Sequence, residues 1–391
     1  MNSTINFNDI IEDSLGPSRA ICLPWLILLS FVYGLIFVAG LIGNTATILV
    51  ILRFKYMQSV TNLYLLNLAI ADLLTLCAAM PLELYQLWHQ YPWELGGFAC
   101  QLKVLIPETT ANASILTLVT FTLERYAAIC GSPKTPPPNI NSSSSTRNRF
   151  TRNTLAIWLL GLLGALPLVL YTRINYLYVN DQPLQGSAWC GLPFNDPDRT
   201  WETIMLSSTI IFFIFPLLII CLLYYFIAIT LKKATRLDPI SNIDLHLNDQ
   251  RCSRKIMQSR KIVIRLLVAI VIAFTICWTP FHAQRLLFLY VSLYSEWSNQ
   301  LRSVNQVLFP MAGVFYYLNS SINPILYSVM STRFRVAFSL YINGLFNGTR
   351  GRDKSVGGGG RGNNSDNSLI LNMPGGKTPK IQWRSPNFID S

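Results

Sequence analysis

Seven long apolar segments dominate this 391-residue chain and restrict the folds open to it. A helix needs about 20 predominantly apolar residues to cross a bilayer, and each segment is close to that length. The composition agrees, because 51% of the residues are hydrophobic and only 13% are charged, unlike an ordinary soluble enzyme. We therefore predict an all-α membrane protein with a seven-transmembrane helix bundle. The expected spans are 23–52, 62–85, 101–129, 154–171, 203–231, 262–290 and 304–327.

Basic residues are distributed unevenly over the connecting loops. Most of them follow the first, third and fifth spans, for example Arg53, Arg147 and Lys232, whereas the intervening loops carry few. The positive-inside rule then places the N-terminus outside and the C-terminal tail in the cytoplasm of a multi-pass plasma-membrane protein. The net charge of +12 is interpreted as cytoplasmic loops beside anionic membrane lipid, not as a nucleic-acid surface.

The regions outside the spans complete the predicted organisation. Residues 1–22 form an extracellular N-terminus, where Asn2 begins an Asn-Ser-Thr acceptor triplet for glycosylation. Residues 23–330 form the seven-transmembrane domain. Basic and aromatic residues at helical spacing in 331–346 predict a short amphipathic eighth helix on the inner membrane surface. Residues 347–391 are rich in Gly, Asn and Ser, which predicts a disordered cytoplasmic tail.

Three of the eight cysteines lie in the predicted extracellular region, and one of them, Cys22, precedes the first span and has no partner in this prediction. Cys100 comes at the start of the third span and Cys190 in the loop after the fourth. That side of the membrane is oxidising, so we predict a disulfide bond that holds the loop over the bundle.

Several polar groups interrupt the apolar spans. Asp72 lies in the middle of the second span, where a carboxylate costs at least about 2.5–3.5 kcal/mol. Ser114, Asn319 and Asn323 are expected at similar depth, and with Asp72 they form a candidate site for an allosteric sodium ion. The alternative is an internal hydrogen-bond network that connects Asn44 with Asp72. No other cofactor is expected.

Two acidic residues lie nearer the extracellular ends of adjacent spans. Glu83 follows Asp72 by about three α-helical turns, which predicts that both share one helix face, and Glu108 lies at comparable depth on the next span. Two such carboxylates in a partly dry cleft favour a bound cation, and the planar guanidinium of a ligand arginine would satisfy both. The alternative is internal neutralisation by Arg285 or Lys103. Arg285 could also contact a ligand carboxylate or carbonyl.

The remaining features favour a bundle that changes conformation. Glu124-Arg125-Tyr126 ends the third span on the cytoplasmic side, where we expect Glu124 to hold Arg125 until it is released to a partner. Pro280 removes a backbone donor and kinks the sixth span beside Trp278. The predicted activation residues are Glu124, Arg125, Tyr126, Tyr224, Trp278, Pro280, Asn323, Pro324 and Tyr327.

In this order, these residues resemble the rhodopsin-like G-protein-coupled receptors. The resemblance extends from about Gly34 to Phe338. It implies seven helices that transmit a signal to a heterotrimeric G protein, with arrestin and receptor kinases as further partners. Its motifs are Gly43-Asn44, Leu68-Ala69-Ile70-Ala71-Asp72, Cys100, Glu124-Arg125-Tyr126, Trp158, Pro167, Cys190, Pro216 with Tyr224, Cys277-Trp278-Thr279-Pro280 and Asn323-Pro324-Ile325-Leu326-Tyr327.

Within that family, four stretches are similar to the neuromedin U, pyrokinin and CAPA peptide receptors. The likeness implies an amidated neuropeptide that ends in Pro-Arg-X-amide and whose arginine reaches Glu83 and Glu108. It also implies a pocket wall of Phe281, His282, Gln284 and Arg285, and coupling to a Gq-type G protein with calcium release. The stretches are Met80-Pro81-Leu82-Glu83-Leu84-Tyr85, Tyr91-Pro92-Trp93, Thr110-Ala111-Asn112-Ala113-Ser114 and, for the CAPA branch, Phe281-His282-Ala283-Gln284-Arg285.

Two positions depart from the family pattern. The proline that usually follows the Arg-Tyr motif is displaced in Cys130-Gly131-Ser132-Pro133-Lys134, and Lys134 stands near the place of a bulky apolar residue. Arg260 stands where many relatives carry an acid that pairs with Arg125, so we expect no such lock between the third and sixth spans.

The sequence also bears on three alternative functions. Another small-peptide ligand, of the thyrotropin-releasing-hormone, neurotensin or ghrelin kind, would fit the same receptor class. A secondary transporter predicts internal repeats and matched broken helices, which the sequence does not show. An enzyme needs a metal cluster or a nucleophile–base pair, and the three histidines lie in separate regions, so we expect no enzyme.

Overall fold

The computed structural model describes most of the chain. The described residues are 11–12, 14–16, 18–19, 21–130, 143–193, 198–237, 247–294, 298–330 and 332–348. The glycosylation triplet at Asn2, the loop 131–142 with Lys134, and the tail beyond Gly348 lie outside them, as does the side chain of Arg260. The chain divides into two compact units, residues 1–343 and 344–391, and only the end of one helix is described in the second.

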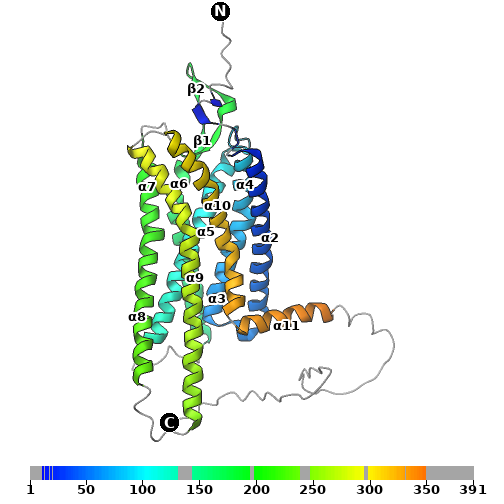
Figure 1. Cartoon of the computed structure of the whole chain (residues 1–391), viewed down its shortest axis with the longest axis vertical. Coiled ribbons are helices and arrows are strands. Elements are labelled where there is room, and N and C mark those ends of the chain that lie inside the picture. Colours follow the sequence, from blue (N-terminus) through cyan, green and yellow to red (C-terminus); the bar gives the residue numbers. More distant parts are fainter. Residues whose placement is uncertain are drawn as a thin grey trace, which may run out of the picture. The chain divides into compact units, whose positions relative to one another are not determined.

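Seven helical spans form the bundle in Figure 1, which confirms the predicted fold class. Within the described residues, six spans are long and apolar enough to cross a membrane, with mean hydropathy from 1.2 to 2.9; α10 is not among them. An amphipathic helix, α11, follows the bundle. The helices are α2 (Leu23–Arg53), α3 (Val60–Leu74), α4 (Met80–Trp88), α5 (Gly96–Cys130), α6 (Ser143–Tyr171), α7 (Thr200–Thr209), α8 (Phe215–Leu237), α9 (Leu247–Tyr294), α10 (Asn299–Met330) and α11 (Thr332–Gly348), with a short turn η1 (Lys55–Met57).

Two spans contain a wide π-helical turn immediately before a proline. In η2 (Thr75–Ala79), which joins α3 to α4, the Met80 N–H donates to the carbonyl five residues back, and Pro81 follows. In η4 (Ile210–Ile214), which joins α7 to α8, the same arrangement precedes Pro216. Proline lacks an N–H and its ring crowds the preceding turn, so a wider turn accommodates it.

The turn η2 corrects one prediction made from the sequence. The count of three α-helical turns between Asp72 and Glu83 is wrong, because η2 lies between them. One extra residue in a turn rotates everything beyond it by about 100°, at about 3.6 residues per turn. The two carboxylates therefore do not share a helix face in the way that the α-helical count predicts.

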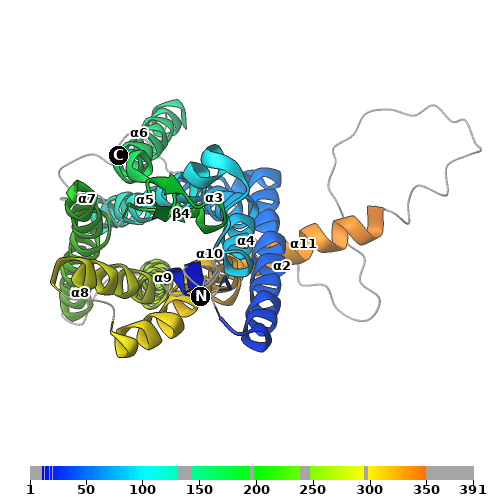
Figure 2. The ribbon, with the colours of Figure 1, turned by 90° about the horizontal axis from the view of Figure 1, so that it is seen from above.

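Helix α5 is central to the packing. It contacts α3, α6 and α8, while α10 contacts α2 and α9, and Figure 2 shows the helices from above. Several polar side chains inside the bundle form hydrogen bonds between helices, where lipid offers no alternative partner. The buried Asn67 accepts from Trp158 Nε1 at 2.9 Å and donates to Thr117 Oγ1 at 2.9 Å, which joins α3, α6 and α5.

A disulfide bond and two small hairpins cover the end of the bundle that carries the N-terminal segment. Strand β1 (Arg173–Asn175) pairs antiparallel with β4 (Trp189–Gly191), and β2 (Tyr178–Val179) pairs with β3 (Gln182–Pro183), next to the turn η3 (Gln185–Ser187). Cys190 in β4 is bonded to Cys100 in α5, with Cα atoms 5.6 Å apart. The predicted disulfide is confirmed.

Candidate functional site

A cavity of about 280 Å³ lies inside the helix bundle, beneath the β4 hairpin. Helices α4, α5, α9 and α10 supply most of its wall. All six side chains that the sequence predicts for ligand binding line this one cavity, although they come from three separate spans. They are Glu83, Glu108, Phe281, His282, Gln284 and Arg285.

An ion pair crosses the cavity from α5 to α9. Arg285 Nη1 donates to Glu108 Oε1 at 2.8 Å, and the two side chains are only 6% and 12% exposed. The guanidinium carbon also lies 5.8 Å from the centre of the Phe281 ring, a cation–π distance. Arg285 Nε and Nη2 are buried and have no hydrogen-bond partner within the described structure. Arg285 therefore neutralises Glu108 while keeping donors for a further group.

Glu83 of α4 lines the same cavity, near Lys103 and Tyr33. Lys103 lines the same cavity and is close enough to Glu83 for electrostatic attraction, while its Nζ lies 6.0 Å from the centre of the Trp93 ring. Gly313 of α10 allows this packing, because a Cβ built there would overlap the Tyr33 hydroxyl and lie 3.7 Å from Glu83 Oε1. A larger residue at position 313 would therefore displace Tyr33, which packs beside Glu83.

Aromatic rings form the floor of the cavity around Trp278. The Trp278 ring centre lies 5.1 Å from that of Tyr316 and 5.7 Å from that of Phe281, and both contacts are edge-to-face. His282 stacks on Phe213 of η4 at 4.0 Å, so it serves as a wall of the pocket. Because Trp278 lies two residues before Pro280, a group that enters the cavity meets the point at which α9 is weakened.

Two members of the predicted cation site, Asp72 of α3 and Asn323 of α10, are bonded to each other inside the bundle, near α2. Asn323 Nδ2 donates to Asp72 Oδ2 at 2.9 Å, and Asn44 Nδ2 donates to the Ser320 carbonyl at 2.7 Å. Ser114 and Asn319 are also buried. The amide nitrogen of Asn323 makes the bond to Asp72, so its amide oxygen is left to bind a cation. Carboxylate, amide and hydroxyl oxygens are ligands that suit a hard ion. These hydrogen bonds also fit the alternative, an internal hydrogen-bond network, although the described residues show no direct bond between Asn44 and Asp72.

The C-terminal end of α5 differs from the prediction. Glu124 pairs with Arg149 of α6 at 3.1 Å, and not with Arg125, because its carboxylate is directed toward the neighbouring helix. Arg125 lies 5.5 Å from the Phe121 ring centre, and its Nε is buried with no hydrogen-bond partner in the described region. Arg125 is therefore held by packing and by more distant charge.

Four further predicted activation residues, Tyr126, Tyr224, Tyr327 and Pro324, are placed by contacts with neighbouring helices. The Tyr126 ring lies 6.3 Å from Phe226 of α8, and Tyr224, also on α8, lies near Arg125. Tyr327 is 1% exposed, its hydroxyl lacks a partner among the described residues, and its ring lies 5.8 Å from Phe334 of α11. Pro324 in α10 packs beside Gly43 of α2, where a Cβ would meet its ring at 2.9 Å.

Sequence reasoning missed three contributors to these sites. Tyr316 forms part of the floor and donates to the Pro107 carbonyl at 3.1 Å. It lies seven residues, or two helical turns, before Asn323 on α10, and this spacing could have indicated from the sequence that Tyr316 also faces the bundle interior. Phe213, which stacks on His282, and Arg149, which binds Glu124, lie on other spans, so no local pattern indicates them.

Comparisons with known proteins give a consistent assignment. Residues 43–327 match the family model described as 7 transmembrane receptor (rhodopsin family). The chain is 37% identical to neuromedin-U receptor 2 of Mus musculus over 326 residues, which cover 83% of this chain and 76% of the relative. It is 36% identical over 349 residues to neuromedin-U receptor 1 of Rattus norvegicus, covering 85% of this chain and 77% of the relative.

A more distant relative extends the comparison beyond mammals. The pyrokinin-1 receptor of Drosophila melanogaster is 31% identical over 381 residues, which cover 85% of this chain and 84% of the relative. The matched region contains the disulfide, the charged cavity, the Asp72 cluster and the C-terminal end of α5. The chain therefore belongs to the rhodopsin family of seven-transmembrane receptors, and it is a receptor, not an enzyme.

Proposed function

We propose that this receptor binds an amidated neuropeptide that ends in Pro-Arg-X-amide, and that it signals through a Gq-type G protein to release intracellular calcium. The observation that carries the proposal is the buried Arg285–Glu108 ion pair beside Glu83, in a cavity of about 280 Å³. A further support is the set of relatives, which are neuromedin-U and pyrokinin receptors. The proposed orientation places the N-terminus, and hence this cavity, on the extracellular side of the plasma membrane.

The peptide arginine acts by replacing Arg285 on Glu108. Its planar guanidinium offers paired donors, so it takes over the Glu108 carboxylate and reaches toward Glu83 in the same cavity. Arg285 then turns its donors to the carbonyl groups at the amidated end of the peptide. In this exchange Glu108 stays paired with a guanidinium, and the freed Arg285 donates to neutral carbonyl oxygens that satisfy its N–H groups. A peptide without the arginine has to leave the internal pair intact.

Binding shifts the bundle toward an active arrangement. The last peptide residues press on the Trp278–Tyr316 floor, and α9 moves outward about Pro280. Asn323 and Asp72 rearrange, and Tyr224 and Tyr327 move inward. Arg125 then becomes available to the G protein, with receptor kinases and arrestin as later partners at the same face.

A sodium ion is proposed to stabilise the resting state. Asp72 supplies a carboxylate that is bonded to Asn323, and the oxygens of the buried Ser114, Asn319 and Asn323 are the neutral ligands in this proposal. Rearrangement of Asn323 during activation would remove a ligand, so the ion and the agonist oppose one another.

Intracellular calcium in cells that express the receptor tests the proposed function. We expect a response to synthetic Pro-Arg-X-amide peptides and a large loss of potency when the arginine is replaced by alanine. A matched peptide with a free carboxylate at its end separates the role of the amide from that of the arginine. Equal potency of the arginine and alanine peptides would reject the arginine contact. Silence despite surface expression, with peptides of the thyrotropin-releasing-hormone, neurotensin or ghrelin kind active instead, would reject the ligand class.

A further inference from the structure

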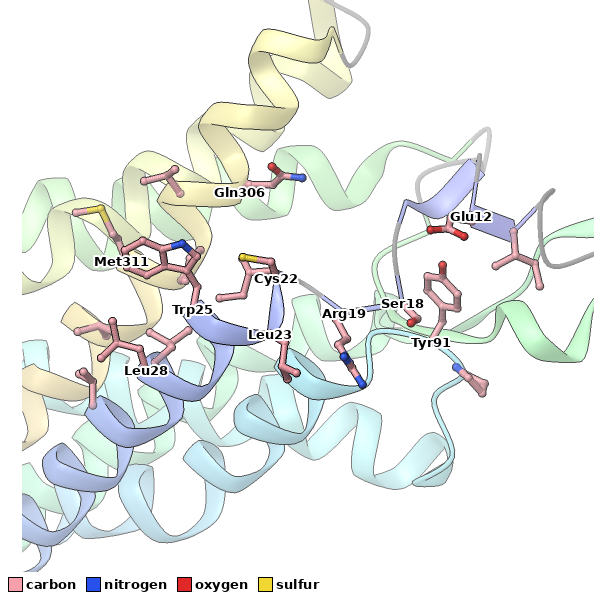
Figure 3. A pocket seen from close by; sticks show the side chains of 18 of the residues that line it. Glu12, Ser18, Arg19, Cys22, Leu23, Trp25, Leu28, Tyr91, Gln306 and Met311 are labelled. Atoms are coloured by element: carbon pink, nitrogen blue, oxygen red, sulfur yellow. The ribbon is translucent and has the colours of Figure 1, made fainter.

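A second and larger cavity, of about 1340 Å³, lies between the N-terminal segment, α2 and α10. Figure 3 shows Trp25 and Leu28 projecting from α2 near Met311 of α10, while Glu12 and Arg19 lie toward the other end. None of the residues that line the charged cavity described above lines this one. It is therefore a separate space that the proposed peptide site does not use.

The helical spacing on α10 shows that this cavity faces away from the bundle interior. Its α10 wall includes Val307, Met311 and Val314, whereas the charged cavity uses Phe309 and Tyr316 of the same helix. The two sets are offset by two residues, about 200° at about 3.6 residues per turn, so they lie on opposite faces. Val307 and Met311 are 61% and 46% exposed. On the outside of a membrane bundle, such a face meets lipid.

The length of the apolar part matches one membrane leaflet. Along α2 its wall extends from Leu23 to Val32, roughly 13 Å at about 1.5 Å per residue. One leaflet contributes about 15 Å to a hydrocarbon core of about 30 Å. An acyl chain that lies along this wall would therefore remain within the hydrocarbon over the whole length of the cavity.

The other end of the cavity carries both signs of charge. Glu12 and Arg19 are exposed, and in the described part of the chain neither side chain takes part in an ion pair or hydrogen bond. The segment that bears them is held in place, since the Tyr91 hydroxyl donates to the Gly16 carbonyl and the Gln90 N–H donates to the Ser18 carbonyl. Burial and the nearby Glu12 carboxylate also raise the pKa of the Tyr91 phenol. A cation and an anion are thus presented together at the mouth of an apolar groove.

We propose that this groove binds one zwitterionic phospholipid, with an acyl chain between α2 and α10, the phosphate at Arg19, and the quaternary ammonium beside Glu12 and Tyr91. A guanidinium pairs well with phosphate, and a quaternary ammonium is attracted to a carboxylate and to an aromatic face. An anionic phospholipid meets only half of this arrangement, because Glu12 repels it. On the proposed orientation, the lipid belongs to the outer leaflet.

Native mass spectrometry of the full-length receptor tests this inference. The receptor is equilibrated with graded amounts of phosphatidylcholine or phosphatidylglycerol, and the lipid molecules that remain bound are counted. Met311→Trp and Leu28→Trp each fill the groove from one wall, and Leu163→Trp on α6, which is 51% exposed and lies outside the groove, is the matched control. Arg19→Gln removes the phosphate contact. Thermal unfolding checks that all variants are folded.

We expect the wild type and Leu163→Trp to retain one phosphatidylcholine that both groove-filling variants lose. Arg19→Gln should raise the half-saturating phosphatidylcholine concentration by about twofold to fivefold, as for an exposed charge pair. Equal retention by the groove-filling variants and the control would overturn the proposal. The proposal would also be overturned if the two lipids were retained equally and Arg19→Gln had no effect. That result would indicate that acyl chains fill the groove without selection for the headgroup. Displacement of the lipid by peptide agonist would assign the groove to the peptide instead.

Discussion

Replacement of Glu108 by glutamine isolates the charge that the peptide arginine is proposed to meet. Glutamine keeps the shape of the side chain and removes its negative charge. Glu108 is 12% exposed and accepts a 2.8 Å bond from Arg285, so a ligand arginine in the same place would make a charge-assisted bond. Such bonds contribute about 1.5–3 kcal/mol, and each 1.4 kcal/mol is a factor of ten. We expect the arginine peptide to lose roughly 10-fold to 150-fold in affinity by that conversion.

The alanine-substituted peptide is the internal control for this prediction. The quantity to measure is the affinity ratio of the arginine peptide to the alanine peptide, by competition binding, which does not depend on coupling. Glu108→Gln should reduce this ratio toward one. Arg285→Gln should increase it, because Glu108 then has no internal partner and the peptide arginine no longer competes. Glu202→Gln, which changes an acid that is 4% exposed and does not line the cavity, should leave the ratio unchanged.

Two outcomes would refute the reasoning. An unchanged ratio in Glu108→Gln would show that the ligand arginine does not use this carboxylate. A decreased ratio in Arg285→Gln would show that Arg285 positions Glu108 for the ligand, and that it does not occupy the ligand's place. Surface expression measured on intact cells distinguishes both outcomes from a failure to fold.

Two further predictions concern stability and sodium. In a thermal unfolding assay, Gly313→Ala should destabilise the receptor by about 1–3 kcal/mol, because the added Cβ overlaps the Tyr33 hydroxyl. Adding Tyr33→Phe to the same chain should recover part of the lost stability. The control Gly97→Ala should be neutral, because its added Cβ meets open space. Sodium chloride should lower agonist affinity of the wild type relative to choline chloride at equal ionic strength, and Asp72→Asn should abolish the difference. A wild type that binds equally in both salts would favour the internal hydrogen-bond network at Asp72.

Long-range properties of the fold were predictable because they depend on segment length and composition. Apolar length predicts the spans, and the position of Cys100 and Cys190 predicts the disulfide bond that the structure contains. Side-chain direction was less predictable. The turn η2 changes where Glu83 is directed, and a proline such as Pro81 indicates a disturbed helix without indicating which kind.

Partner choice inside the bundle was the least predictable property. Glu124 has Arg125 beside it in the sequence, yet it pairs with Arg149 on another span. For Glu108 the sequence left three partners open, a ligand, Arg285 and Lys103, and Arg285 binds it in the structure. Such choices depend on the rotation of two helices about their axes, and a few degrees on each decide which charges meet. Periodicity in one segment carries no information about its neighbour's rotation.

The polarity of α10 has a consequence for how the receptor is made. This helix is not among the six described spans that are apolar enough to cross a membrane. Its C-terminal half carries four buried polar residues, Asn319, Ser320, Ser321 and Asn323. Alone in lipid it would leave these groups without partners, at a cost of several kcal/mol. In the bundle, Asn44 binds the Ser320 carbonyl and Asp72 binds Asn323. The last span therefore depends on the first two being in the membrane to receive it. Damage to Asn44 or Asp72 would then show during biosynthesis, as a failure of the seventh helix to insert.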